Sequence, residues 1–280
     1  MITRFAPSPT GPLHLGHAYS AMLAHDMARA AGGTFLLRIE DIDSTRSRPA
    51  WEAQILDDLA WLGLTWKPVM RQSDRLPAYR EALESLWDRS LIYPCTCNRR
   101  DILAAASAPQ EGAAMGPDGV IYPGTCRTHA RVGSIPTDGA LRLDMRTAMK
   151  GIDFVEHDHN GKTVVTSRDH LIDHIGDVVL SRRDMGTSYH LSVVLDDAAQ
   201  AVTDVVRGED LRDATPIHVL LQRLLTLPTP VYHHHRLIRD EAGKRLAKRD
   251  DARAIATYRS EGATPTDIRR MVGLPLHLAR

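Results

Sequence analysis

The stretch of sequence that decides the fold reads Arg4-Phe5-Ala6-Pro7-Ser8-Pro9-Thr10-Gly11-Pro12-Leu13-His14-Leu15-Gly16-His17. An apolar run ending at Phe5 predicts a strand, the prolines and Gly11 predict a loop, and a helical pattern follows from His17 to Ala31. Such a strand–loop–helix unit directs backbone N–H groups and the positive end of the helix at one place, which suits a phosphate group. His14 and His17 are three residues apart, so both imidazoles can face that place. Two histidines at this spacing commonly occur by chance, so the interpretation as a phosphate-binding motif rests on the whole stretch.

Composition sets the broad class. The 280 residues can hold one large domain, or one domain with a small insertion, and the 43% hydrophobic and 25% charged content is that of an ordinary globular protein. Lys+Arg and Asp+Glu both number 35, so any RNA contact must come from a local basic face. We expect neither a signal peptide nor a membrane span. Three cysteines, two of them nearly adjacent, favour a reducing, cytoplasmic compartment and a possible metal site over a disulfide framework.

Strands and helices alternate after the opening loop. Residues Thr34 to Ile39 form an apolar run of strand length that ends in Glu40 and Asp41, and two helical patterns follow, one near Pro49 and one around Tyr79. In open α/β sheets, ligands bind at the carboxyl ends of the strands, where Glu40 stands. The order predicts an α/β fold with a doubly wound parallel sheet.

The remaining elements are predicted more briefly. An insertion begins near Tyr93 and ends near His129. Residues 139–167 have a β-rich pattern, with Asn160-Gly161 as a hairpin turn. The other predicted elements are strands at Asp177–Leu180 and Thr203–Val206, helices at Tyr189–Ala201 and Asp213–Leu227, and tail helices at 251–260 and 265–273.

The opening stretch resembles the HIGH signature of class I aminoacyl-tRNA synthetases, in the form that the glutamyl/glutaminyl group uses. The resemblance implies a Rossmann-type nucleotide-binding domain with a parallel sheet, a small zinc-binding, β-rich insertion and a short helical C-terminal tail. It also implies that His14, Gly16 and His17 bind ATP together with Mg²⁺, and that the two histidines are catalytic.

A second motif, rich in basic residues, reads Gly243-Lys244-Arg245-Leu246-Ala247-Lys248-Arg249-Asp250. A basic run at a loop is usually a solvated surface. Placed after the first motif, it resembles the KMSKS loop of the same family, which reads Lys-Leu-Ser-Lys-Arg in the glutamyl group. Arg245 and Ala247 depart from that pattern, whereas Lys248 is kept. The resemblance makes Lys248 a catalytic, ATP-binding cation that neutralises charge developing on the phosphates.

Recognition of an amino acid needs a cation for a carboxylate and an anion for the ammonium group. Arg4 offers a bidentate fork and Glu40 a counter-charge, although a salt bridge between them is the commoner explanation of such a pair. The resemblance implies an L-glutamate site made of Arg4, Phe5, Ala6, Pro7, Ser8, Glu40, Tyr189 and Arg207. Tyr189 and Arg207 come from the matching runs Tyr189–Asp197 and Val205–Leu211.

The cysteines form a candidate metal site. Cys95-Thr96-Cys97 is a weak metal signature, because two soft ligands still need two more, and three buried structural cysteines are an open alternative. The arrangement resembles the Cys-x-Cys…Tyr-x-x-x-Cys zinc site of glutamyl-type synthetases. This implies one structural zinc held by Cys95, Cys97, Tyr122 and Cys126, with His129 as the alternative fourth ligand.

The resemblance covers Ile2 to about Asp250, and only about 30 residues follow, so we expect no anticodon-binding domain. We expect four parts: residues 1–92 as the first half of the catalytic domain, 93–130 as the insertion, 131–235 as an acceptor-like segment with the second catalytic half, and 236–280 as the KMSKS-like loop and tail.

This shape resembles the short paralogues of glutamyl-tRNA synthetase. They activate glutamate with ATP without needing tRNA and then esterify it to queuosine in the anticodon loop of tRNA(Asp). We therefore expect ATP, L-glutamate and queuosine-containing tRNA(Asp) as partners of a monomer. Two alternatives stay open: a truncated synthetase that charges the 3′ end, and a non-catalytic RNA-binding paralogue.

Overall fold

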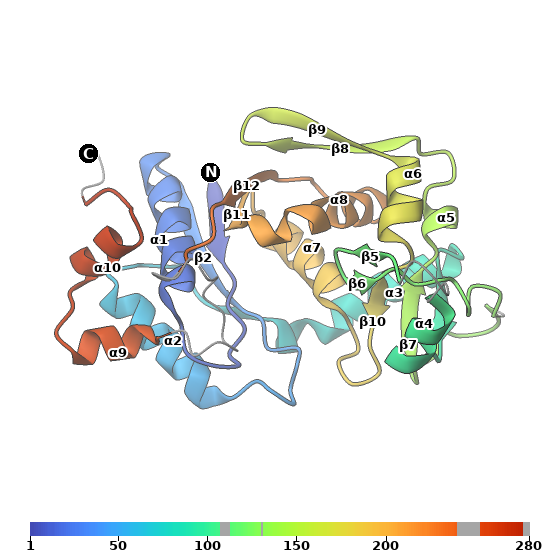
Figure 1. Ribbon diagram of the computed structural model, residues 1–280, viewed down its shortest axis with the longest axis horizontal. Coiled ribbons are helices and arrows are strands. Elements are labelled where there is room, and N and C mark those ends of the chain that lie inside the picture. Colours follow the sequence, from blue (N-terminus) through green and yellow to red (C-terminus); the bar gives the residue numbers. More distant parts are fainter. Residues whose placement is uncertain (107–112, 130, 240–252, 277–280) are drawn as a thin grey trace. The chain divides into compact units, whose positions relative to one another are not determined.

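The structure is a computed structural model that describes residues 1–106, 113–129, 131–239 and 253–276 (Figure 1). The chain forms two compact units. Unit 1 contains Met1–Asp74, Ala201–Arg212 and Pro230–Arg280, and unit 2 contains Arg75–Gln200 and Asp213–Thr229. The KMSKS-like residues 243–250 lie outside the described residues.

Unit 1 is built on parallel strands. Strand β1 (Ile2–Phe5) pairs in parallel with β2 (Thr34–Ile39), and β2 pairs in parallel with β3 (Met70–Arg71). Strands β11 (Asp204–Gly208) and β12 (Val231–His235) form a second parallel pair. A hydrogen bond of 3.0 Å from Thr203 N to Ile2 O brings the start of β11 beside β1. The parallel α/β class is therefore confirmed.

Helices cover these strands and form the core of unit 1. Helix α1 (Leu15–Ala30) connects β1 to β2, and α2 (Pro49–Trp61) connects β2 to β3, with the short η1 (Gln72–Arg75) after it. Buried apolar side chains of α1 and α2, such as Met22 and Leu59, join Leu37 of β2 in one hydrophobic cluster. The tail helices α9 (Ile255–Ser260) and α10 (Pro265–Met271) bury Ile255 and Ile268 in the same cluster. The tail is thus part of the unit 1 core.

Unit 2 contains a small antiparallel sheet with the strand order β10–β7–β4. Its strands are β4 (Ile92–Cys95), β7 (Ala140–Leu143) and β10 (Val179–Ser181). Hairpin β5–β6 (Met115–Gly116 and Gly119–Val120) belongs to the insertion. The helical elements of this unit are α3 (Leu76–Asp88), α4 (Arg99–Ala106), α5 (Met145–Ala148), α6 (Arg168–His170), η2 (Leu171–Ile175), α7 (Tyr189–Ala199) and α8 (Thr215–Leu224). The short η3 (Glu209–Ala214) begins in unit 1 and precedes α8 in the chain.

The hairpin predicted around Asn160-Gly161 is confirmed. Strands β8 (Phe154–His159) and β9 (Lys162–Ser167) pair antiparallel around Asn160 and Gly161. Both turn residues have positive φ, 53° and 77°, which is the backbone that a two-residue turn of this kind requires. The register follows from the turn, because it fixes which residues of the two strands face each other.

Helices α7 and α8 end earlier than predicted, and α10 also stops two residues early, at Met271. Helix α7 stops at Ala199 because Ala201 turns to a φ of +52°. Helix α8 begins at Thr215, with Pro216 in its first turn as predicted, and ends at Leu224 before Thr226 adopts a φ of +55°. Apolar periodicity continues through both helix ends, so the sequence pattern overestimates the helix lengths.

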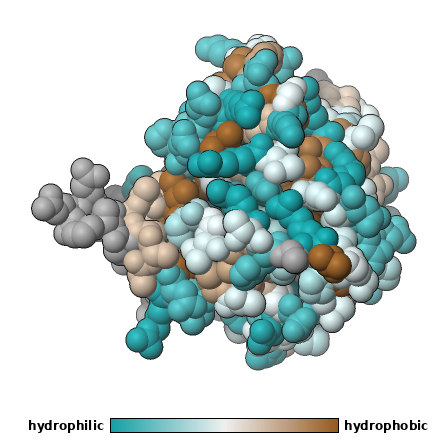
Figure 2. Space-filling model, turned by 90° about the vertical axis from the view of Figure 1, so that its right-hand side faces the viewer, coloured by the Kyte–Doolittle hydropathy of each residue, from teal (hydrophilic) through white to brown (hydrophobic). Residues whose placement is uncertain are grey.

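The outer surface is mixed in character. On the face shown in Figure 2, hydrophobic side chains lie scattered among hydrophilic ones, as on an ordinary solvated surface. No helix within the described ranges has both the length and the apolar composition that crossing a membrane requires.

Candidate functional site

The turn from His14 to His17 is held by two reciprocal hydrogen bonds. His14 is the N-cap of α1, and its Nδ1 accepts from Gly16 N at 3.1 Å. In return, Nδ1 of His17 accepts from His14 N at 3.2 Å. The two rings stack with centroids 3.8 Å apart. This is a capping box in which both side chains are imidazoles, a role that Ser or Thr and Glu usually fill.

The capping bonds have a chemical consequence. A ring nitrogen that accepts from a backbone N–H carries no proton, so the proton of each neutral imidazole is on Nε2. Both histidines therefore offer an N–H donor on the ring edge opposite the cap. Gly16 leaves room for the ring, since a Cβ at this position would lie 3.0 Å from Cε1 of His14, which is a tight contact. The motif thus combines two imidazole donors with a helix N-terminus, the usual setting for a phosphate.

The loop before the helix is tied to the end of β2. Glu40 N donates to Pro7 O at 3.0 Å, and Arg48 N donates to Pro9 O at 3.0 Å. The backbone of Pro7 therefore lies next to Glu40. The Glu40 carboxylate pairs with buried Arg38 at 3.3 Å, and Arg4, only 4% exposed, donates to Val206 O at 3.4 Å. Arg38 is a neighbour of the site that the sequence reasoning missed.

Arg207 lies near the end of β11 and is 5% exposed. Its Nε donates to Nε2 of His234 at 3.2 Å, and its guanidinium carbon lies 5.1 Å from the centre of the Tyr232 ring. His234 is opposite Arg207 in the β11–β12 register, and its neighbour His233 contacts Asp204 at 2.8 Å. His234 therefore positions a predicted site residue. The strand register, which periodicity alone does not reveal, explains this role.

Tyr189 lies in unit 2, at the first position of α7. Next to it, Nδ1 of His190 is 3.1 Å from Nε2 of His218, and Nε2 of His190 is 2.8 Å from Asp118. The Tyr189 ring lies against both imidazoles, with centroids 5.5 and 5.6 Å away. Hydrogen bonds between insertion and helices therefore hold this turn of α7. The sequence contains no spacing signal that joins these residues.

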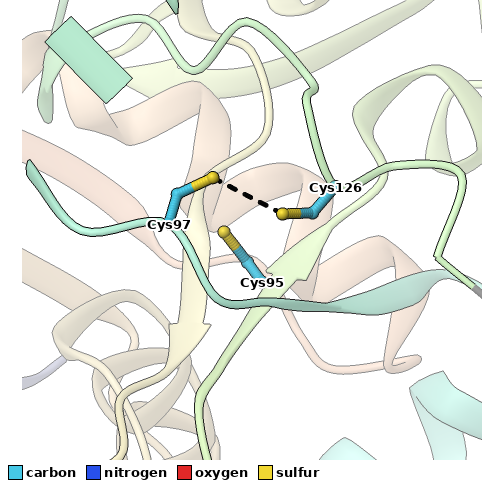
Figure 3. A group of neighbouring side chains, drawn as sticks. All are labelled: Cys95, Cys97 and Cys126. Carbon is cyan, nitrogen blue, oxygen red and sulfur yellow. Dashed lines mark hydrogen bonds between the residues drawn. The ribbon is translucent and has the colours of Figure 1, made fainter. Parts of the chain in front are cut away.

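The three cysteines converge in unit 2 (Figure 3). Cys95 is the last residue of β4, Cys97 follows it, and Cys126 lies in a turn after the β5–β6 hairpin. Their Sγ atoms all lie within 4.8 Å of one another, and the Cys97–Cys126 sulfur distance of 3.5 Å is too long for a disulfide. Zinc bonded to sulfur at ~2.3 Å in a tetrahedron separates the sulfurs by ~3.8 Å, so the cluster fits such an ion.

Tyr122 completes a set of four groups. Its hydroxyl oxygen lies 3.4 Å from Sγ of both Cys95 and Cys97, and it accepts from Cys126 N at 2.9 Å. Burial and hydrogen bonds to the sulfurs raise the pKa of Tyr122. Burial also raises the pKa of Cys97. Burial acts in the same direction on Cys126, but hydrogen bonds from Tyr122 and from the backbone of Thr96 outweigh it and lower the pKa of Cys126 to about 6.

His129 is placed differently from Tyr122. It is exposed, and its backbone N–H donates to Cys126 O. Among the residues described, the group that can hold a metal ion consists of the three cysteines without His129. The geometry therefore supports Tyr122 over His129 as the neighbour of the sulfurs.

Comparisons with known proteins show the family of the chain. Residues 1–275 match the family model for the catalytic domain of class I tRNA synthetases (E and Q). A glutamyl-Q tRNA(Asp) synthetase of Rhodobacter capsulatus is 67% identical over 285 residues, covering 98% of this chain and 100% of that protein. A protein of the same name from Albidiferax ferrireducens is 40% identical, covering 98% and 92%.

A solved structure is similar over almost the whole chain. It is a glutamate tRNA ligase from Elizabethkingia meningosepticum in complex with its amino acid, with a TM-score of 0.75 and 26% identity. The alignment covers 97% of this chain and 60% of the ligase, so the chain spans about three fifths of that protein.

Proposed function

Because the chain belongs to the family of class I tRNA synthetases for glutamate and glutamine, we propose that it activates L-glutamate with ATP and transfers it to queuosine in tRNA(Asp). Family membership confirms the resemblance found in the opening motif. The observation that carries the proposal is the 67% identity, over full length, to a glutamyl-Q tRNA(Asp) synthetase. The reciprocal histidine turn supports the ATP-dependent step.

The first step forms an adenylate. A carboxylate oxygen of glutamate attacks the α-phosphorus of ATP in line, and the bond to pyrophosphate breaks. The Nε2–H groups of His14 and His17 donate to the phosphates, and Lys248 neutralises the charge on the leaving group. ATP carries Mg²⁺, which shields its phosphates. Catalysis here is positioning and electrostatics, because the protein supplies no covalent group.

Glutamate binding uses the residues around the opening strand. Arg4, with Arg207 as a second cation, faces a carboxylate, and Glu40 faces the ammonium group. The backbone from Phe5 to Ser8 lines the site. Support comes from the hydrogen bond between Glu40 and Pro7, which joins the two parts of unit 1 that carry these groups.

The second step moves the glutamyl group to RNA. A queuosine hydroxyl attacks the adenylate carbonyl carbon and loses its proton, and AMP leaves. A 3′-end-charging glutamyl-tRNA synthetase is the second candidate, favoured by similarity to the E. meningosepticum ligase. That similarity is 26% identity, against 67% for the glutamyl-Q relative, so queuosine is the preferred acceptor.

We also propose one structural zinc ion, held by Cys95, Cys97, Cys126 and Tyr122. Such an ion links the end of β4 to the turn after the β5–β6 hairpin. All four ligands come from protein, so the ion holds structure and takes no part in the chemistry.

The deciding experiment uses labelled glutamate. The protein is incubated with ATP and with tRNA(Asp) carrying or lacking queuosine, and ribonuclease digestion locates the label. We expect label in the anticodon fragment, only when queuosine is present. Label on the terminal adenosine favours the second candidate instead. Absence of glutamate-dependent ATP–pyrophosphate exchange overturns both and favours a non-catalytic paralogue.

The matched variant for this assay is Lys248→Ala. We expect it to abolish exchange while leaving the unfolding temperature unchanged, because the proposed role of Lys248 is to act on the phosphates. Exchange near the parent rate would remove Lys248 from the proposed mechanism.

A further inference from the structure

A buried arginine, Arg142, contacts the cysteine cluster without belonging to its proposed ligand set. It lies on β7, where it is opposite Tyr93 of β4, and Ala140 is opposite Cys95. Side chains of directly opposed residues share a face of the sheet, and so do side chains two residues apart on one strand. Arg142 therefore lies on the same face as Tyr93 and Cys95. Its exposure is 8%.

Three contacts hold the guanidinium against the cluster. Nε donates to Sγ of Cys95 at 3.3 Å, and Nη1 donates to the main-chain oxygen of Asp177 at 2.8 Å. The guanidinium carbon lies 3.9 Å from the centre of the Tyr122 ring. The group therefore reaches two of the four proposed ligands at once.

The nearby carboxylates already have arginine partners of their own. Asp177 pairs with Arg127 at 2.8 Å, and Asp144 pairs with Arg131 at 2.6 Å. Burial pushes the pKa of Asp144 upward, but hydrogen bonds from Arg131 and Thr147 hold it below its ordinary value. Within residues 1–106, 113–129, 131–239 and 253–276, no carboxylate forms an ion pair with Arg142. Asp118 acts on Arg142 only through its charge, because its carboxylate contacts His190. A buried guanidinium with no carboxylate in contact is costly, so an anion belongs beside it.

The cysteine cluster supplies that anion once it holds zinc. Three thiolates, a neutral Tyr122 hydroxyl and one Zn²⁺ carry a formal charge of −1, which the +1 charge of Arg142 balances. We infer that Arg142 is the counter-cation of the metal site and that its guanidinium raises the affinity of the cluster for zinc. The inference rests on the proposed zinc site, and it requires no part of the proposed glutamate chemistry.

The role belongs to an outer ligand shell. Groups that contact metal ligands orient them and tune the metal, and their loss typically weakens metal binding by 10–100-fold. The site needs a planar guanidinium, because Cys95 Sγ, the Asp177 main-chain oxygen and the Tyr122 ring lie in three directions around it. A lysine ammonium keeps the charge and cannot make all three contacts.

The test measures zinc affinity by competition with a chromophoric chelator on the full chain. We expect Arg142→Met to bind zinc at least tenfold more weakly than the parent protein. The matched control is Arg146→Met, which removes an exposed arginine from α5 and is expected to bind zinc like the parent. An affinity of Arg142→Met within threefold of the parent overturns the inference.

A second measurement separates tuning of the metal from a purely structural role. Zinc should raise the unfolding temperature of Arg142→Met by less than it raises that of the parent. If the substitution lowers the unfolding temperature by the same number of degrees with and without zinc, Arg142 has only a packing role, and the inference is overturned. If Arg142→Met does not fold, Arg142→Lys is measured in its place. We expect its zinc affinity to be at least threefold below that of the parent, and an affinity equal to the parent's overturns the inference.

Failure of the zinc site itself looks different. A parent protein that binds no zinc removes both the site and the role of Arg142. A parent that binds zinc and a variant that binds it equally well removes only the role of Arg142.

Discussion

The histidine turn of unit 1 and the cysteine cluster of unit 2 are held together by opposite means. In the turn, each imidazole accepts from a backbone N–H no more than three residues away. In the cluster, two segments about 30 residues apart meet through side chains, with Tyr122 between the sulfurs. A local site survives damage elsewhere in the fold, whereas a non-local site also holds the fold together. Mutations should therefore separate chemistry from stability.

The largest expected effect is on the cluster. Cys126→Ser should abolish stoichiometric zinc binding and lower the unfolding temperature by roughly 10 °C, because loss of a ligand removes both the metal and the link between the segments. Metal analysis and thermal unfolding measure the two effects. Full zinc content in this variant would show that Cys126 is not needed to hold the metal and would contradict the link between the two segments.

Substitutions in the histidine turn should lower activity more than stability. His14→Asn keeps an N-cap acceptor but removes the imidazole donor, so we expect ATP–pyrophosphate exchange to fall about 100-fold with little change in stability. His14→Ala should lose the same activity and also about 1 kcal/mol of stability, because the cap is gone. Zinc content should equal that of the parent in both. An active His14→Asn would place the role of His14 in capping alone.

The fourth ligand gives the next effect in size. Tyr122→Phe should weaken zinc binding about tenfold, because it removes the oxygen that lies between two sulfurs. His129→Ala should bind zinc like the parent. The same chelator competition compares them, and the reverse ranking would make His129 the ligand.

The smallest effect concerns a buried carboxylate. In unit 2, Asp144 is paired with an arginine, whereas Asp58 on α2 of unit 1 is 1% exposed, and neither of its carboxylate oxygens has a hydrogen-bond partner among the described residues. Burial, with a smaller contribution from Asp57, raises the pKa of Asp58 to about 6. A raised folded-state pKa means that Asp58 costs stability above pH 6 and that this cost disappears below about pH 4.

Asp58→Asn should therefore stabilise the protein by about 2 kcal/mol at pH 8 and leave its stability nearly unchanged below pH 4. Urea unfolding across this range measures the difference. A stabilisation that does not vary with pH would show that Asp58 is not buried in its charged form.

Contiguous motifs were the predictable part of this molecule. The opening strand, loop and helix follow one another in sequence, and parallel pairing of β1 with β2 follows from a helix between two apolar runs. The cysteines and Tyr122 were likewise predicted as neighbours, on family resemblance. Helix ends were predicted less well, since the backbone turns at Ala201 and Thr226 have no signature in the apolar pattern.

The neighbours of the predicted residues needed the fold. Arg38 beside Glu40, His234 beside Arg207, and the group Asp118, His190 and His218 beside Tyr189 are joined by register or by packing between distant segments. Single residues such as these have no spacing that sets them apart from incidental ones. Their roles appear only where the strands pair and the helices pack.

The consecutive residues of the opening stretch were enough to predict a phosphate-binding helix entrance, because such a site needs only neighbouring residues and backbone N–H groups. The class of reaction came from the family resemblance of the same stretch. Tertiary structure decided how charge is balanced. Arg142 shares a face with Cys95 through antiparallel pairing of β4 and β7, and the arginines on Asp144 and Asp177 leave its charge for the cysteines. Electrostatic compensation depends on distance in space, and only the folded chain sets those distances.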